Sequence, residues 1–410
     1  MSGMQQKGMV KMKRILFVIN TLGRAGAETS LISLLKKMDA KGCEISLYVL
    51  TGQGEMISQI PSYVKVLNAK FSGQTLWSKK GRRELFRTVW KAFLKNGRYL
   101  RKIGSVMSNL IDMNRRGRIQ KDKLFWRVLA EGAVRFEDRF DLAIAWLEGG
   151  AAYYVAEHVK ADKKAAFIHI DYEKAGYTRK MDEDCWRYYE KIFIVSGDAR
   201  EKFRKIYPEY EDRTAVFPNI IDQEQILCRA GEAGGFADSY KGMRILTVGR
   251  LTYQKGYDIA IDAMKIVKDR GYCVRWYVLG EGEQRRALEK KIRSSGLEKD
   301  FLLLGAVENP YPYFAQADLY VHAVRFEGQG IVVLEAQTLG CAVIVSDYCG
   351  SAELVQNGKY GLTCELTPVA VADRIMELLD DGEQRVELGK RAAAKTAIQG
   401  QEEMLLALME

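Results

Sequence analysis

The chain has 410 residues, a net charge of +10, and the hydrophobic (47%) and charged (28%) content of an ordinary soluble globular protein. This length predicts two domains with separate cores, and no apolar run approaches the ~20 residues of a membrane-spanning helix. The seven cysteines are scattered and none is spaced as CxxC, which argues against both a disulfide framework and a zinc site.

Residues 1–217 predict a parallel sheet interleaved with helices. The first 14 residues are basic and lead directly into a short apolar run, which indicates a cytosolic strand rather than a secretory signal. Short apolar runs separated by helical patterns are typical of strands that helices cover on both faces. A helix is predicted over Ala27–Met38. The strand candidates of this half are Ile15–Ile19, Ile45–Leu50, Leu142–Trp146, Ala166–Ile170 and Ile192–Ser196.

A basic segment, residues 70–135, holds 18 Lys/Arg against 4 Asp/Glu and so carries all the excess positive charge of the chain. Within it, residues 84–94 place apolar side chains on one helical stripe with basic side chains around it. Such a helix, with Trp and Phe, fits an anionic membrane surface. Two other interpretations stay open. The stripe packs on the first domain while its charges are solvated, or the segment forms a nucleic-acid groove, which is the least favoured.

Residues 218–242 predict a hinge or linker, because Pro218-Asn219 favours a turn and three glycines follow it. Residues 243–390 repeat the alternation of strands and helices, and residues 391–410 predict a C-terminal helix that could pack back on the first domain. The second set of strand candidates is Ile245–Gly249, Val274–Leu279, Phe301–Leu304, Leu319–His322 and Val343–Ser346. The predicted fold class is α/β: two Rossmann-like, doubly wound parallel-sheet domains that face each other across a cleft.

The stretch between Glu327 and Glu335 carries the most chemical information. Gly328 and Gly330 let the backbone approach a ligand, and the helix that follows directs amide groups at it from an end that favours anions. Glu335 lies among apolar residues, so its charge needs hydrogen-bond donors such as sugar hydroxyls. The stretch predicts a pocket for a ligand that has both hydroxyls and phosphates.

Arg250 and Lys255 follow the first strand of the second half, where they can supply two cations for a diphosphate. The combined pattern resembles the large family-4 group of retaining glycosyltransferases with the GT-B fold, in the clade that builds bacterial surface polysaccharides. The motifs that carry the resemblance are Gly249-Arg250 with Lys255-Gly256, Gly280-Glu281-Gly282, Phe326-Glu327-Gly328 with Glu335-Ala336, Gly350 with Glu353, the glycine loop Asn20–Glu28, and Asn309–Tyr313 with Ala317-Asp318.

Matched position by position, the resemblance implies that Arg250 and Lys255 hold the donor diphosphate. Glu335 would bind the nucleotide ribose and Glu327 would face the donor sugar. His169 would lie near the reacting sugar, on the first-domain side of the cleft. The other implied donor-side positions are Gly249, Gly280, Gly328, Gln329, Gly330 and Ile331, and the implied acceptor-side positions are Gly23 and Gly26.

The resemblance implies transfer of a sugar from a nucleotide-diphosphate donor to a hydroxyl of a glycan or polyprenyl-linked glycan, with retention of configuration. No metal or other cofactor is expected, because the two cations and the helix amides would stabilise the departing diphosphate. The protein is expected in the cytoplasm, peripheral on the inner face of the plasma membrane, without a nucleic-acid partner. The alternatives are a nucleotide-sugar epimerase or hydrolase on the same scaffold, and a non-catalytic protein that binds sugar nucleotides.

Asp182-Glu183-Asp184 has the DxD form of the metal-binding motif found in the other main glycosyltransferase fold. The run continues into a helical pattern, so we interpret the three acids as solvated residues at a helix N-terminus. Glu148-Gly149-Gly150, after a strand, leaves an acceptor loop and a simple tight turn as equal interpretations.

Overall fold

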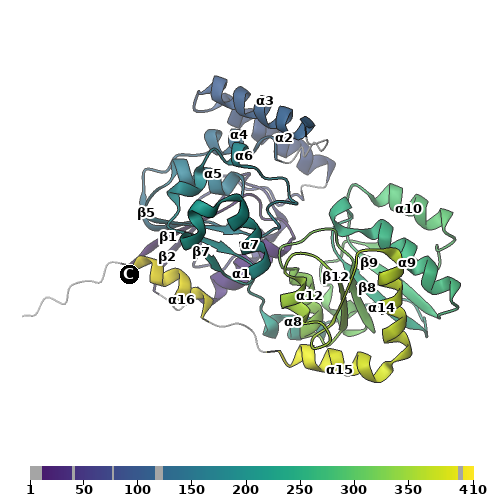
Figure 1. The fold of residues 1–410 in the computed structure, drawn as a ribbon. Helices are drawn as coiled ribbons and strands as arrows, with labels where there is room; N and C mark the ends of the chain where they lie inside the picture. The colour runs from purple at the N-terminus through teal and green to yellow at the C-terminus, as the bar shows by residue number, and fades with distance from the viewer. Residues whose placement is uncertain (1–11, 39–41, 76–77, 116–122, 396–399) are drawn as a thin grey trace, which may run out of the picture.

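The computed structural model describes residues 12–38, 42–75, 78–115, 123–395 and 400–410, which form two α/β domains (Figure 1). No helix in these ranges is both long enough and apolar enough to cross a membrane. Each domain is built on one all-parallel sheet, and helices pack against both faces of it. The predicted fold class is therefore confirmed.

The first sheet has seven strands in the order β3-β2-β1-β4-β5-β6-β7, so its strand order reverses between β1 and β4. Ile15 and Phe17 of β1 face the core on the α1 side, whereas Leu16 faces the core on the α5 side. Both faces of the strand are thus apolar, as helix-covered strands require. The strands are β1 Arg14–Ile19, β2 Glu44–Val49, β3 Lys65–Val66, β4 Arg139–Ala145, β5 Lys160–Ile168, β6 Lys191–Ile194 and β7 Thr214–Val216.

The helices of the first domain include two that stand apart from its sheet. The hairpin of α2 and α3 packs on α4 at the outer end of the domain (Figure 1). The other helices lie against the strands or connect them. Their bounds are α1 Gly26–Met38, α2 Lys79–Leu94, α3 Tyr99–Arg115, α4 Trp126–Gly132, α5 Gly150–His158, α6 Arg179–Asp182 and α7 Gly197–Ile206.

The second sheet has six strands in the order β10-β9-β8-β11-β12-β13, and its order reverses between β8 and β11. The strands are β8 Met243–Val248, β9 Val274–Leu279, β10 Phe301–Gly305, β11 Leu319–His322, β12 Ala342–Ser346 and β13 Leu362–Cys364. The helices are α9 Tyr257–Asp269, α10 Arg285–Ser294, α11 Tyr311–Ala315, α12 Ile331–Thr338, α13 Ser351–Val355, α14 Pro368–Asp380 and α15 Gly382–Ala393.

Two segments join the domains. Residues 218–242, the predicted linker, contain α8 Gln223–Ala230, which packs on α11 and α12 of the second domain. Asp238 of the same segment accepts a hydrogen bond from the Tyr277 hydroxyl at 2.6 Å. After α15 the chain returns to the first domain, where α16 Gln401–Leu406 packs on α1 and buries Leu405 in the core (Figure 1).

The ten strands predicted from the sequence are all present, with ends that differ by a few residues. Three strands were missed: β3, β7 and β13, of two or three residues each, at the edges of the two sheets. A run of two or three residues is too short to show a hydrophobic period. Only pairing with a longer neighbour makes these segments strands.

Candidate active site

The carboxyl ends of β8 and β11 lie where the second sheet reverses its strand order, which is where doubly wound sheets bind ligands. Lys255 ends a 3-10 turn after β8, and Glu327 follows β11. Lys255 Nζ forms an ion pair with the Glu327 carboxylate, and both side chains are mostly buried. The fold thus joins two residues that lie 72 positions apart in the sequence.

The Glu327 carboxylate is held in its charged form. Burial alone would raise its pKa, but Lys255 and His322 outweigh burial and lower the pKa to about 2. His322 Nε2 lies 3.7 Å from Glu327 Oε2, and burial lowers the pKa of His322 to about 4. Glu327 therefore fixes Lys255 in place as a cation before any ligand arrives. Sequence reasoning assigned no role to His322, whose one signal was its place at the end of β11.

Glu335 lies in the second turn of α12, buried against the core of the second domain. Its Oε1 accepts a hydrogen bond from the Tyr311 hydroxyl at 3.1 Å. Burial raises the pKa of Glu335 to about 7, although this hydrogen bond opposes the rise. Additional donors on a ligand would favour the charged carboxylate. Sequence reasoning included Tyr311 in the motif Asn309–Tyr313 but did not pair it with Glu335, because a motif gives no distance to a residue in another helix.

We expect Glu335→Gln to be more stable than the natural protein at pH 8 and to lose that advantage at pH 5. The folded-state pKa, about 7, lies above the ordinary value of 4.5. The stability contributed by the protonated carboxyl is therefore present at low pH and is lost as pH rises through 7, by about 1–3 kcal/mol. Thermal unfolding of both proteins between pH 5 and pH 8, without nucleotide, checks this. A difference that does not change with pH would contradict it.

The glycine loop before α12 touches the first domain. A Cβ atom on Gly328 would lie 2.0 Å from the carbonyl oxygen of His169, so no larger residue fits there without movement. Gly330, which precedes α12, has a φ of 82° that favours glycine. A Cβ on Gly26 would lie 3.1 Å from the Ile331 side chain. The first-domain glycine loop and the start of α12 are therefore in contact.

His169 follows β5, and its side chain is partly buried. Its ring packs 5.2 Å from the Trp146 ring, and its backbone amide donates to Glu148 Oε2 at 3.0 Å. Burial lowers the pKa of His169 to about 4, so the imidazole is neutral at neutral pH. Both ring nitrogens are buried and make no hydrogen bond of good geometry within the described ranges, and the Asn219 side chain opposes part of the lowering of the pKa. Glu148 thus supports the end of β5, a role that neither of its sequence interpretations included.

Arg250 follows β8 and approaches the first domain. Its charge lowers the pKa of Glu28, at the start of α1, although burial dominates and raises that pKa to about 7. The Thr21 hydroxyl donates to Glu28 Oε1 at 3.3 Å. Arg250 is exposed, so its positive charge is accessible to a ligand at the end of β8.

The remaining predicted positions surround this cluster. A Cβ on Gly280 would lie 1.9 Å from the carbonyl oxygen of Gly249, so the ends of β8 and β9 pack backbone to backbone. The Gln329 side chain is engaged elsewhere, because its Oε1 accepts from the Asn219 amide at 2.6 Å. A Cβ on Gly23 would meet only the Glu55 carboxylate, at 3.6 Å. Gln329 therefore links α12 to the interdomain segment instead of pointing at Lys255.

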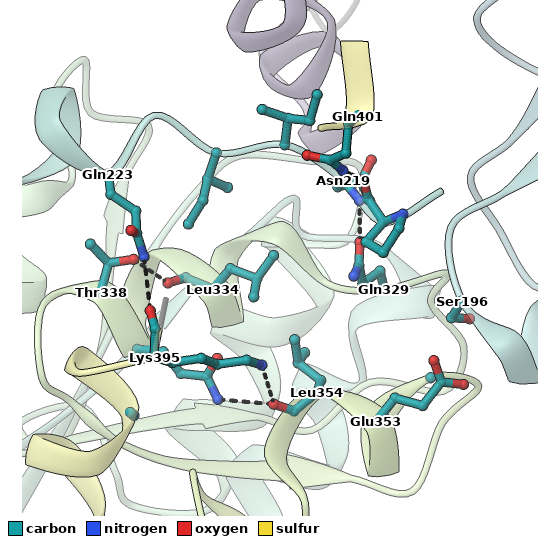
Figure 2. A pocket seen from close by; sticks show the side chains of 16 residues that line it. Ser196, Asn219, Gln223, Gln329, Leu334, Thr338, Glu353, Leu354, Lys395 and Gln401 are labelled. Carbon is teal, nitrogen blue, oxygen red and sulfur yellow. Dashed lines mark hydrogen bonds between the residues drawn. The ribbon is translucent and has the colours of Figure 1, made fainter. Parts of the chain in front are cut away.

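A cavity of about 150 Å³ lies beside α12, next to the interdomain segment (Figure 2). Figure 2 shows Gln329 against Asn219, and Lys395 against the Leu354 carbonyl, which its Nζ meets at 3.2 Å. The residues that line the cavity do not include Lys255, Glu327 or His169. The cavity therefore lies beside the segment that connects the two domains, whereas the Lys255–Glu327 ion pair lies at the carboxyl ends of the strands.

Asp198 and Glu353 join the two domains by capping each other's helices. Glu353 accepts from the amides of Gly197 and Asp198, at 3.1 and 2.9 Å, at the start of α7. Asp198 accepts from the Gly350 amide at 3.1 Å, just before α13. Carboxylates are favoured at helix N-termini, so this reciprocal pair stabilises the contact between the domains.

We expect Gly328→Ala to lower turnover at this site by roughly tenfold, because the added methyl group would push the glycine loop away from His169 and misplace the groups around the ligand. The matched control is Gly73→Ala, because a Cβ at Gly73 would have no neighbour within 4 Å. Steady-state rates and far-ultraviolet circular dichroism of both variants check the prediction. Equal rates for the two variants would show that the contact between Gly328 and His169 does not matter for turnover.

Asp182, Glu183 and Asp184 do not form the predicted solvated helix N-terminus. Asp182 is the last residue of α6 and is fully buried, so that interpretation is wrong. Glu183 forms an ion pair with Arg101, and Asp184 accepts a hydrogen bond from the Tyr210 hydroxyl. The donors to Asp182 are the hydroxyls of Tyr153, Tyr172 and Tyr207 and the indole nitrogen of Trp186. The three carboxylates have separate protein partners and do not converge on a shared point.

One group of side chains in the described ranges has the spacing of metal ligands: Glu131, Glu157 and His158. Arg101 already pairs with both carboxylates, at 2.7 and 2.9 Å, and Arg127 pairs with Glu157 at 2.5 Å. Glu157 and His158 of this group precede the start of β5 in the first domain. The Lys255–Glu327 pair instead follows the carboxyl ends of β8 and β11 in the second domain. Paired arginines offset the charge that a metal ion would otherwise neutralise.

Comparison with known proteins first defines the class of fold. Residues 239–395 match the family described as glycosyl transferases group 1. TarM of S. aureus, a mutant solved with fondaparinux, α-GlcNAc-glycerol and UDP, aligns over 97% of this chain and 99% of its own, with a TM-score of 0.65 and 13% identity. HepE of Anabaena, solved with UDP and glucose, aligns over 97% of both chains, with a TM-score of 0.63 and 18% identity. The two-domain fold is therefore the GT-B fold of glycosyltransferases.

A named relative is similar to part of the chain. It is the N-acetylgalactosamine-N,N'-diacetylbacillosaminyl-diphospho-undecaprenol 4-alpha-N-acetylgalactosaminyltransferase of Campylobacter jejuni. The two are 34% identical over 182 residues, which are 43% of this chain and 48% of the relative. The chain thus matches about half the length of that relative.

Proposed function

We propose that this protein is a glycosyltransferase. It transfers a sugar from a nucleotide-diphosphate donor to a hydroxyl of a glycan or lipid-linked glycan, with retention of configuration, in the synthesis of cell-surface polysaccharide. The observation that carries the proposal is the buried Lys255–Glu327 ion pair at the point where the second sheet reverses its strand order, next to the loop that touches His169. The glycosyltransferase family match of residues 239–395 covers the same domain.

The donor would bind at the carboxyl ends of β8 and β11. Lys255 and Arg250 would hold the diphosphate together with the amides at Gly330 and Ile331, because a helix N-terminus favours phosphate. Glu335 would accept hydrogen bonds from the ribose hydroxyls. As the diphosphate leaves, the fixed cation of Lys255 would stabilise the growing negative charge, so the proposal requires no metal or other cofactor.

The sugar would lie between Glu327 and His169. The neutral imidazole of His169 can donate or accept a hydrogen bond to a sugar hydroxyl without adding charge. We assign no residue as a covalent nucleophile. Instead, the acceptor oxygen would bond to the anomeric carbon from the face that the diphosphate leaves, and the hydroxyl proton would pass to the departing diphosphate, so that configuration is retained. The Gly23 and Gly26 loop would border the acceptor.

The acceptor we propose is a polyprenyl-linked glycan at the inner face of the plasma membrane. The Campylobacter jejuni relative is named as a transferase that adds a sugar to a diphospho-undecaprenol-linked acceptor. The basic segment would bring the enzyme to the same surface. Nucleic acid is no part of the proposal.

Nucleotide binding tests the donor half directly. Thermal-shift measurements with UDP, GDP, ADP and their sugars should raise the unfolding temperature for one base, and radiolabel from that donor should then enter membrane lipids. Transfer should survive EDTA. Label released as free sugar without an acceptor would favour a hydrolase, an epimerised donor would favour an epimerase, and no shift with any nucleotide would contradict the proposal.

A further inference from the structure

The hairpin of α2 and α3 exposes an unusual amount of apolar surface. Eight of the eighteen large hydrophobic side chains that are exposed in the described residues lie between positions 86 and 111. They are Phe86, Trp90, Leu94, Tyr99, Leu100, Ile103, Met107 and Ile111, and we call them the outer apolar face. Exposed apolar side chains gathered in one place mark an interaction surface, whereas single ones are normal.

The side that α3 buries is largely polar, although it also includes Met113, and Val106 packs against the first-domain core. The residues it buries include Lys102, Ser105 and Asn109, and the Lys102 ammonium donates to the Ala92 carbonyl at 2.8 Å, near the end of α2. The opposite side carries Leu100, with 87% of its surface exposed, and continues through Ile103, Met107 and Ile111. These positions recur every three or four residues and so form one stripe along the helix. A helix that faced only water would expose the polar side instead.

The helix α2 divides its apolar residues between two sides. Val89 and Phe93 pack against the core of the first domain, as the packing interpretation expected. Phe86 and Trp90, one turn apart, are 69% and 57% exposed on the other side. Packing on the first domain therefore accounts for only part of the apolar stripe predicted over residues 84–94.

The charges around the outer apolar face are almost all positive. Residues 79–115 hold eleven Lys/Arg and two Asp/Glu, and Arg101 is engaged by Glu131, Glu157 and Glu183. On α2 the cations are free of such pairing: no salt bridge joins Arg82, Arg83, Arg87 or Lys91 to any acid in the ranges that the structure covers. A surface that combines exposed apolar side chains with cations that form no salt bridge fits a partner that has a hydrophobic interior and an anionic surface.

We propose that the α2–α3 hairpin docks on an anionic lipid bilayer, with the outer apolar face in the headgroup region and the α2 cations against lipid phosphates. This docking identifies the part of the protein that would contact the membrane. It rests on the proposed function only for the reason why the protein binds a membrane, and not for the binding itself. A second copy of this chain is a poorer occupant, because a symmetric contact would set the α2 cations of one copy against those of the other. Against anionic lipids the same charges are attractive.

Vesicle flotation tests the docking without nucleotide or acceptor. The full chain should float with phosphatidylglycerol vesicles and much less with phosphatidylcholine vesicles. Leu100→Ser/Ile103→Ser should weaken binding by about tenfold, because two apolar side chains leave the interface. The matched control is Val369→Ser/Val386→Ser, which alters two exposed apolar side chains of the second domain and should bind like the natural protein.

The electrostatic part has its own pair of variants. Arg87→Gln/Lys91→Gln should weaken binding to phosphatidylglycerol by on the order of tenfold or more, and added salt should remove the difference. Arg286→Gln/Lys290→Gln, with the same spacing on α10, should have no effect. Trp90 reports insertion, since its emission should shift to the blue on vesicles and the shift should be absent in Trp90→Phe.

Two results would overturn the docking: equal binding of all four double variants, or a dimer in sedimentation velocity that Leu100→Ser/Ile103→Ser dissolves while vesicles have no effect. The second result would assign the outer apolar face to self-association. The test also separates this proposal from the enzymatic one. A protein that binds vesicles through the hairpin but binds no nucleotide would keep the membrane surface and lose the transferase.

Discussion

Lys255→Ala is expected to slow sugar transfer by roughly 10²–10³-fold, because it removes a fixed cation from the place where negative charge develops. The ion pair with Glu327 holds the ammonium at the strand ends before the donor binds. Lys255→Ala would therefore remove an ammonium group that is already in position and does not have to move during the reaction. We expect kcat to fall more than KM rises, since charge on the diphosphate grows mainly in the transition state.

The difficulty with this variant is that it leaves a buried carboxylate without its partner, which costs stability as well as activity. Lys255→Ala/Glu327→Gln removes that charge, so it should recover much of the lost unfolding temperature and none of the lost rate. Lys290→Ala, an exposed lysine on α10, is the control for loss of a positive charge. Steady-state kinetics with radiolabelled donor decide the matter. Unchanged turnover in Lys255→Ala would remove this residue from the mechanism.

The parallel sheets could be predicted because their strands are buried on both faces. Ile344 of β12, for example, lies in the core on one side and Val345 in the core on the other. Such strands appear in the sequence as short uninterrupted apolar runs between helical patterns, and it is this alternation that separates them from a buried helix such as α12, which also begins with four apolar residues. The edge strands have no such run. The sequence predicted that a C-terminal helix could pack back on the first domain, and α16 does so, but no local pattern showed that Leu405 is the residue that enters the core beside α1.

Glu327 and Lys255 were predicted as site residues from motifs. The structure adds what a motif does not contain, which is the set of charged groups that lie close to each of them. The low pKa of Glu327 depends on Lys255, from the turn after β8, and on His322, at the end of β11. Likewise, Gln329 belongs to the glycine motif, yet its side chain is bound to Asn219 of the interdomain segment. Spacing along the chain predicts the backbone shape of a loop better than it predicts where a side chain points.

The basic segment shows the same limit for helices. Charge and a 3.6-residue period located α2, but a period alone does not say which side packs. In α3 the buried side carries Lys102, which is satisfied by carbonyl groups at the end of α2. A lysine in that position would be taken for a solvent-facing residue in any analysis of amphipathicity. Only its hydrogen bonds explain why the apolar side is left outside.

Asp182→Ala is expected to destabilise the first domain by about 3–5 kcal/mol. Its carboxylate accepts from the Tyr153 and Tyr172 hydroxyls, at 2.9 and 2.7 Å, and from the hydroxyl of Tyr207. Alanine would leave these buried donors without an acceptor, and each unmet group costs about 1–3 kcal/mol. Tyr172 lies three residues beyond His169, so loosening this network should also reduce transfer at temperatures where the protein is still folded.

Urea unfolding followed by tryptophan fluorescence measures the effect, because Trp186 lies in the same network. Glu183→Ala is the matched control: it removes the neighbouring acid, whose ion pair with Arg101 is partly exposed and should contribute about 1 kcal/mol or less. Asp182→Asn keeps the shape and one acceptor oxygen, so it should fall between the two. If Asp182→Ala and Glu183→Ala had the same midpoint, the acids would be interchangeable surface residues, as the interpretation of a solvated helix N-terminus implied. The buried position of Asp182 requires them to differ, and the ordering of these three midpoints tests that requirement.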